Sequence, residues 1–246
     1  MSQDSLYTDP DLSQFYDLEN GWGDDFSYCA KLAKGADSVL DLGCGTGELL
    51  SAIAPKHAVG VDPAGAMLDI ARQRNGGDQV EWLQADARGL ELGERFDLIM
   101  LTSHAFQVFL TNEDQRAVLK TIRQHLTPNG RFVFDTLNPA RKAWERWTPE
   151  HSERSLMHPI QGKTKVWSDA QYNAATQIVS YQTHYQPLAG NRIYAAKSHI
   201  RFTPQPELAT RLDASGLAVL HWMGNWQGAP LSNGQKEIIP IGRLAS

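Results

Sequence analysis

A glycine-rich loop at residues 43–47 is the part of this sequence best suited to hold a small ligand. Gly43, Gly45 and Gly47 follow the apolar run at residues 38–42 and precede a segment with helical periodicity. Glycines at a strand-to-helix turn allow positive φ angles and let a ligand lie against the backbone, where the first N–H groups of the helix point at it. The loop therefore predicts a ligand site, but it does not by itself identify the ligand.

Three carboxylates accompany the loop at positions where apolar runs end. Asp41 stands just before the first glycine, Asp62 ends the run at residues 57–62, and Asp86 follows the run at residues 80–84. Nicotinamide-binding loops have the spacing Gly-x-Gly-x-x-Gly, with an acidic residue about 20 positions later. Here the spacing is Gly-x-Gly-x-Gly, and one acidic residue precedes it. This difference favours another ligand.

Strand-like and helical segments alternate through the first half of the chain. Helical periodicity follows the first two strands and returns over residues 111–126, and we expect Thr46 to cap the first helix. The expected strands lie at residues 38–42, 57–62, 80–84, 96–101 and 131–135. This alternation predicts an α/β fold with a doubly wound, mostly parallel sheet.

The pattern changes after residue 138. Residues 163–169, 176–186 and 191–202 resemble antiparallel strands, and a helix follows to about Ser215. Two further strands, at residues 217–223 and 236–243, close the chain. We therefore expect three parts: an amino-terminal segment with the α/β core at 1–136, a β-rich insertion at 137–202, and a closing helix and hairpin at 203–246.

Five segments, in order, resemble the motifs of class I S-adenosylmethionine-dependent methyltransferases. Residues 39–47 closely resemble the first motif of that family, and residues 59–62 and 84–87 look like the second and third. Residues 96–99 and 126–132 are similar to the signatures of the fourth and fifth strands. The resemblance covers about residues 36–136. It implies a seven-stranded Rossmann-like sheet with an antiparallel last strand, and S-adenosyl-L-methionine as the cofactor, with S-adenosyl-L-homocysteine as the product.

The resemblance also implies roles for the three carboxylates. Asp62 would accept hydrogen bonds from the ribose hydroxyls, unless it only caps a helix. Asp86 would accept from the adenine amine, beside the backbone N–H of Ala87, unless it only forms a turn. Asp41 would bind the ammonium of the methionine tail, unless it only ties down the loop. The other expected cofactor-binding residues are Gly43, Cys44, Gly45, Gly47, Pro63, Met67, Thr102 and Ser103.

Catalytic candidates are fewer, because methyl transfer mainly requires positioning and needs a general base only when the nucleophile arrives protonated. His104 follows the fourth strand and could accept a proton as a neutral imidazole; a structural role or a cofactor contact are its alternatives. Asn138 could orient the nucleophile. Tyr16 and Trp22 lie in a segment that in related small-molecule methyltransferases often folds over the cofactor. No cluster of metal ligands is evident, so we expect no metal.

The substrate is constrained less closely. The insertion loosely resembles the β layer that covers the active site in glycine N-methyltransferases and amino-sugar N,N-dimethyltransferases. Residues 1–136 hold 11 Lys and Arg against 21 Asp and Glu, which argues against a nucleic-acid partner. Residues 137–246 hold 12 against 7, and Arg201 there could pair with a substrate carboxylate or phosphate. We expect N- or O-methylation of a small molecule, which could be anionic.

Composition sets the remaining limits. Hydrophobic residues make up 41% and charged residues 21%, as in a globular protein. No apolar stretch approaches the roughly 20 residues of a membrane helix, and the two cysteines suit a reducing cytoplasm. We therefore expect a cytoplasmic monomer or homodimer. The alternatives are an inactive S-adenosylmethionine-binding protein, a nicotinamide-dependent oxidoreductase, which the glycine spacing opposes, and an RNA or protein methyltransferase, which the charge pattern opposes.

Overall fold

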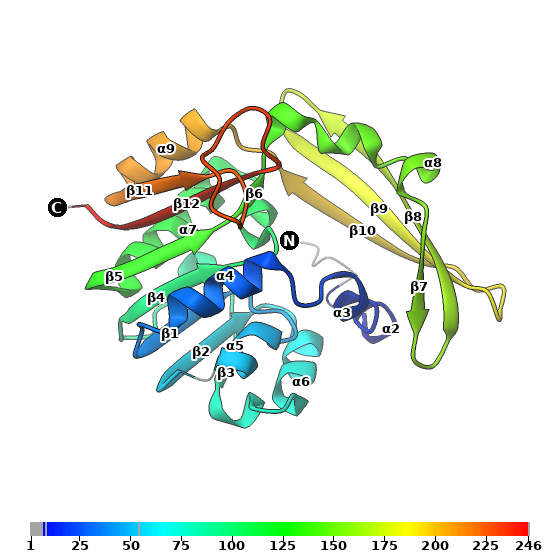
Figure 1. Cartoon of the computed structure of the whole chain (residues 1–246), viewed down its shortest axis with the longest axis horizontal. Coiled ribbons are helices and arrows are strands. Elements are labelled where there is room, and N and C mark those ends of the chain that lie inside the picture. The colour runs from blue at the N-terminus through cyan, green and yellow to red at the C-terminus, as the bar shows by residue number, and fades with distance from the viewer. Residues whose placement is uncertain (1–6, 8, 54, 246) are drawn as a thin grey trace.

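The larger sheet of the protein has the strand order β11-β12-β5-β4-β1-β2-β3 (Figure 1). This computed structural model describes residues 7, 9–53 and 55–245. Its five parallel strands are β1 (Ser38–Leu42), β2 (His57–Asp62), β3 (Glu81–Gln84), β4 (Phe96–Leu101) and β5 (Leu126–Phe134). The last strand, β12 (Glu237–Leu244), runs antiparallel between β5 and β11 (Leu217–Met223), and β6 (Thr136–Leu137) pairs with its beginning. The predicted doubly wound sheet with an antiparallel last strand is confirmed.

Two apolar layers cover this sheet. Residues of α4 (Asp24–Ala33) and α5 (Glu48–Ile53) pack with one set of strand side chains. Residues of α7 (Asn112–His125) and α9 (Gln205–Ala214) pack with another set. Helix α6 (Gly65–Gln73) contacts β2 and β3. Because both faces of the parallel strands are buried, these strands are continuous apolar runs in the sequence.

Short 3-10 turns connect several of these elements. They are η1 (Gly77–Gln79), η2 (Ala87–Gly89) and η3 (Ala105–Val108) in the core, and η4 (Pro139–Arg141) and η5 (Ala143–Arg146) after β6. The last two lead through α8 (Pro149–Ser152) into the insertion. Among the residues that the structure describes, no helix is long and apolar enough to span a lipid bilayer.

A second sheet is built entirely from the insertion. Its order is β10-β9-β8-β7, and all neighbours are antiparallel. Strands β8 (Gly162–Asn173), β9 (Ile178–Pro187) and β10 (Tyr194–Arg201) correspond to the three predicted strands, whereas β7 (Arg154–His158) was not predicted. Figure 1 shows α2 (Pro10–Ser13) and α3 (Tyr16–Glu19) beside this sheet, between it and the core. The amino-terminal segment therefore lies where the two sheets face each other.

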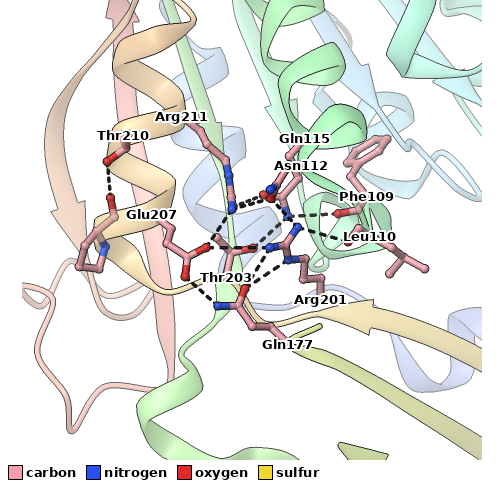
Figure 2. A network of polar contacts seen from close by, with 11 residues as sticks. Phe109, Leu110, Asn112, Gln115, Gln177, Arg201, Thr203, Glu207, Thr210 and Arg211 are labelled. Atoms are coloured by element: carbon pink, nitrogen blue, oxygen red, sulfur yellow. Dashed lines mark hydrogen bonds and ion pairs between the residues drawn. The ribbon is translucent and has the colours of Figure 1, made fainter. Parts of the chain in front are cut away.

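A polar network fixes the insertion to the core where β10 ends (Figure 2). Arg201 donates to the side chains of Gln177 and Asn112, and Arg211 donates to Asn112 and Glu207. Each arginine side chain is only 11% exposed. Arg201, which the sequence suggested for a substrate anion, thus uses its guanidinium to join β10 to α7 and α9.

Candidate active site

The glycine loop lies between β1 and α5, and all three of its glycines have positive φ: 81° at Gly43, 53° at Gly45 and 73° at Gly47. A Cβ on Gly47 would come within 2.4 Å of the Trp82 ring and 2.7 Å of Ala71. A Cβ on Gly45 would lie 3.6 Å from the nearest atom. Gly47 therefore permits close packing of the core, while Gly45 belongs to the open side of the loop.

The hydroxyl of Thr46 does not act as the predicted helix cap. It donates to Oδ1 of Asp17 at 2.5 Å and accepts from Nη2 of Arg74 at 3.0 Å. Nε of Arg74 also donates to the carbonyl of Thr46 at 2.6 Å, and Arg74 pairs with Asp17. The middle of the loop is thus tied to α3 and to the residue after α6, which was not evident from the local sequence.

Asp41 and Asp62 lie together beneath the loop. Asp62 accepts the N–H of Gly45 at 3.0 Å and that of Ala64 at 2.8 Å, so it joins the loop to the start of α6. Oδ1 of Asp41 is buried, and none of the residues that the structure describes provides it with a hydrogen-bond partner. Burial, together with the charge of Asp62, raises the pKa of Asp41 to about 7. A buried carboxylate with an unused acceptor fits the cationic methionine tail of S-adenosylmethionine, while the ribose role of Asp62 stays a prediction.

The expected adenine end of the site is at the carboxyl end of β3. Asp86 caps η2 by accepting the backbone N–H of Arg88 at 2.9 Å, and its carboxylate pairs with the same guanidinium. Hydrogen bonding to Arg88 lowers the pKa of Asp86 despite partial burial. Ala87, the next residue, is buried, as is Met67 of α6. Adenine would therefore share the Asp86 carboxylate with Arg88, and this role also stays a prediction.

His104 lies in a strained turn at the end of β4. Ser103 and His104 have φ angles of 53° and 61°, which are uncommon for residues with side chains. Oδ1 of Asp135, just after β5, accepts the backbone N–H of His104 at 2.9 Å. Nε2 of His104 lies 3.2 Å from Oδ2 of Asp135 and 3.7 Å from Oε1 of Glu237, the first residue of β12. The ends of three strands thus bring one imidazole and two carboxylates together.

The charges of these three groups are strongly linked. Burial lowers the pKa of His104, but Asp135 and Glu237 outweigh this effect, so its pKa lies above the ordinary value. Burial raises the pKa of Asp135 to about 6, and His104 opposes this rise. Burial also tends to raise the pKa of Glu237, yet His104 and Lys236 bring it below the ordinary value. The imidazole can therefore hold a proton between two acidic groups.

A cavity of about 350 Å³ opens beside this group. It lies between the connection from α3 to α4, the ends of β4 and β5, and the loop before β12, and carboxylates outnumber cations in its lining. The acidic lining residues are Asp24, Asp25, Asp135 and Glu237, beside His104 and Lys236. Burial and then the charges of Asp41, Asp135 and Asp25 raise the pKa of the Cys29 thiol. The Cys29 thiol is thus within electrostatic reach of Asp41 and of two cavity carboxylates.

Tyr16 and Asn138 have different positions relative to the cavity. The Tyr16 ring lies over Gly45, and burial together with Asp62 raises the pKa of its hydroxyl. Asn138 donates to the carbonyls of Ser232 and Gln235 and accepts the N–H of Ala140. Its amide is thus occupied in holding the loop before β12. These contacts favour an anchoring role for Asn138 and a site role for Tyr16.

The remaining predicted residues are arranged around these groups. Ser103 lines the cavity and donates to Asp25 at 3.4 Å. Thr102 is buried at the end of β4, whereas Trp22 is 46% exposed and packs edge-on against Phe26.

The four cavity carboxylates, those of Asp24, Asp25, Asp135 and Glu237, were missed by the sequence analysis. Asp135 ends the apolar run at residues 131–135, a position like those of Asp41 and Asp62 in their runs. The sequence therefore did carry a signal for Asp135. No local pattern distinguishes Asp25 or Glu237. The ligand atoms of His104, Asp135 and Glu237 lie within 4.8 Å of one another, a spacing that could also hold a metal ion. The sequence did not suggest this, because the three residues come from separate elements.

Comparison with known proteins identifies the chemistry of this site. Residues 39–130 match a family model described as a methyltransferase domain. The cypemycin N-terminal methyltransferase of Streptomyces sp is 26% identical over 208 residues, which cover 83% of this chain and 82% of that protein. The malonyl-[acyl-carrier protein] O-methyltransferase of Bacillus cereus is 39% identical over 102 residues, 40% of this chain and 36% of that enzyme.

A solved S-adenosylmethionine-dependent methyltransferase from Clostridium acetobutylicum has the same fold. It superposes with a TM-score of 0.78 at 17% identity, over 96% of this chain and 98% of the other. Residues 39–130 thus form a methyltransferase domain, and the chain has the fold of that S-adenosylmethionine-dependent methyltransferase. The methyltransferase motifs occupy the loop, the strand ends and the buried carboxylates described above, so the family assignment and the geometry agree. The nicotinamide-dependent and inactive alternatives are set aside.

Proposed function

We propose that this methyltransferase N-methylates a primary or secondary amine on a small molecule or short peptide. The observation that carries the proposal is the convergence of His104 with Asp135 and Glu237 at a cavity that also holds Asp24 and Asp25. Such a cavity favours a protonated amine over an anionic substrate, because opposite charges attract and like charges repel. The earlier expectation of an anionic group finds no support in this lining.

The amine must lose a proton before its lone pair can attack. When bound, S-adenosylmethionine supplies a methyl group on a positively charged sulfur. The carboxylates of Asp135 and Glu237 attract the ammonium form, and Nε2 of His104, in the fraction of molecules in which the imidazole is neutral, accepts its proton. Asp41 holds the methionine tail, and Tyr16 covers the loop from the amino-terminal side. The nucleophile is thus deprotonated where it is bound.

A relative that aligns with most of this chain supports an amine. It covers 83% of this chain, and its name states that it methylates an amino terminus. The O-methyltransferase of Bacillus cereus aligns over 40% of this chain. At 208 residues, the alignment with the N-terminal methyltransferase extends well beyond residues 39–130, the range that matches the domain model.

A direct test offers matched amines and alcohols as acceptors. The enzyme is incubated with S-adenosylmethionine and with amino sugars, short peptides with free or acetylated amino termini, and the corresponding hydroxyl compounds. S-adenosylhomocysteine release is measured, and the product is located by mass spectrometry. We expect products methylated on nitrogen, and no product from the acetylated peptides. Methylation confined to oxygen would overturn the proposal.

The metal-like spacing of His104, Asp135 and Glu237 favours one rival, a cation-assisted O-methyltransferase. Dialysis against EDTA separates the two. If His104 acts as a base, activity is retained after chelation and is not raised by Mg²⁺ or Mn²⁺. Loss of activity on chelation, with recovery on adding a divalent ion, would assign the three residues to a metal.

A further inference from the structure

The segment around α3 contacts the core and the insertion with successive residues. Phe15 is fully buried and stacks on Tyr185 of β9, with ring centroids 4.4 Å apart and planes 15° apart. The next residue, Tyr16, lies over Gly45 of the glycine loop. Tyr16 also packs against the apolar cluster that Phe15 forms with the insertion. The segment thus contacts both the core and the insertion, and its position depends on both.

The two acidic residues of α3, Asp17 and Glu19, also contact different parts of the protein. Asp17 faces the core, where it accepts from Thr46 and pairs with Arg74. Glu19 faces the insertion, where its two oxygens accept from Nε and Nη2 of Arg154 at 2.7 and 2.6 Å. The hydroxyl of Tyr185 also donates to Glu19 at 3.2 Å. Helix α3 is therefore held between an arginine of the core and an arginine of the insertion.

We infer that Glu19 and Arg154 are positioning residues for S-adenosylmethionine binding, although neither contacts the glycine loop. A four-residue helix has almost no stability of its own, so side-chain anchors decide where it lies. A two-point arginine–carboxylate pair fixes orientation as well as distance. By holding α3 on the insertion, this pair keeps Tyr16 and Asp17 against the loop.

The expected effect on cofactor affinity follows from the fraction of molecules in which α3 is in place. If the pair is broken, a smaller fraction of molecules has α3 in place, and the apparent affinity for the cofactor falls in proportion to that fraction. The side chain of Glu19 is 15% exposed and that of Arg154 is 43% exposed. Because Phe15 remains packed on Tyr185, the fold itself should persist. The result is a specific loss of cofactor affinity.

The test measures S-adenosylhomocysteine binding by calorimetry in E19Q, R154A and the charge reversal E19R/R154E. We expect the Kd to rise about threefold to tenfold in the two single variants and to recover at least partly in the reversal, with Tm nearly unchanged. The control is E153Q, which breaks the 2.7 Å ion pair with Lys165 in the same sheet. Its Kd should stay within twofold of the parent value.

Binding of S-adenosylhomocysteine needs no methyl acceptor, so this test does not depend on the proposed amine substrate. If the two single variants bind like E153Q, or if the reversal binds no better than they do, the inference is wrong. The second outcome would mean that the variants act by local disruption rather than by loss of the ion pair.

Discussion

Asp41 is the residue whose ionisation should control cofactor binding. Burial and Asp62 raise its pKa to about 7, so near neutral pH only part of the protein carries this charge. A cationic cofactor prefers the ionised form, and its affinity should therefore rise with pH through this value. Below pH 7, S-adenosylmethionine binding should therefore release a proton from this carboxyl group.

We predict that the pH dependence of S-adenosylmethionine affinity differs between the parent protein and Asp41→Asn. Between pH 6 and 8, calorimetry should show an increase in S-adenosylmethionine affinity that is larger in the parent than in the variant. At pH 8 the variant should bind more weakly by about 1–3 kcal/mol, because a hydrogen bond to a charged group is lost. The variant also corrects for titration of the cofactor's own amino group. Equal pH dependence in both proteins would contradict the assignment.

His104 has two neighbours that act on its pKa in opposite directions. Glu237 raises the pKa, and Lys236 lowers it. A general base must be unprotonated, so kcat/KM should increase with pH through the pKa of His104. Glu237→Gln should therefore move this acidic limb to lower pH, and Lys236→Met should move it to higher pH.

Measurements of kcat/KM as a function of pH, at a saturating concentration of S-adenosylmethionine, give both shifts. Because Lys236 is well exposed, its shift should be the smaller one. Shifts in the same direction for both variants, or none for Glu237→Gln, would show that another group controls the profile.

At the scale of elements, the glycine loop needs glycine at position 47 for two reasons, its backbone conformation and its close packing. Gly47 and Gly93 both have φ of 73°, but a Cβ on Gly47 would overlap Trp82 and Ala71, whereas nothing lies within 4 Å of the corresponding position on Gly93. The two glycines therefore allow backbone strain to be separated from steric overlap.

We expect Gly93→Ala to reduce the free energy of unfolding by about 1–2 kcal/mol, the usual cost of a left-handed residue. Gly47→Ala should cost about 1–3 kcal/mol more, because its Cβ overlaps packed side chains. Urea denaturation with tryptophan fluorescence measures both. Equal losses would mean that Trp82 moves aside without cost.

The core elements were predictable because their signals are local. Apolar runs and helical periodicity identify β1 to β4 and α7 within a few residues, whereas β5 begins at Leu126, five residues before the predicted strand at 131–135. Strand β7 lacks such a signal: its residues are mostly exposed, and only His158 at its end is buried. It forms because it pairs with β8. This pairing depends on the folded arrangement of the insertion and cannot be read from the segment itself.

The same reason explains the misjudged side chains. Thr46 has the residue type and position of a helix cap, but Asp17 and Arg74, far away in the sequence, bind its hydroxyl. Arg201 had suggested a substrate contact, yet it completes the network of Figure 2 with partners from three other segments. Cofactor residues follow a motif, whereas the cavity carboxylates come together only through folding.

At the scale of the whole molecule, the carboxylates at one end of the large sheet oppose folding when they are ionised. The pKa values of Asp41, Asp62 and Asp135 are all raised, mainly by burial. A raised pKa means that the folded protein binds more protons than the unfolded chain. Stability from these groups is therefore present at acidic pH and is lost as pH rises through about 6 to 7.

The cofactor-free protein should accordingly lose thermal stability between pH 5.5 and 8. Differential scanning calorimetry should show a falling Tm over this range, with a smaller fall in Asp41→Asn and a smaller fall when S-adenosylmethionine is present. A Tm that rises over the same range in the parent protein would show that these carboxyl groups do not have raised pKa values.

The turn at Ser103 and His104 has a consequence for how this enzyme can be improved. Glycine would adopt φ of 53° at position 103 without strain, so Ser103→Gly is a stabilising change. The same change would give the backbone that carries His104 new freedom to leave its place beside Asp135. With His104 in its proposed role, Ser103→Gly should therefore raise thermal stability and lower turnover, and selection for heat resistance alone would be expected to loosen the active site there.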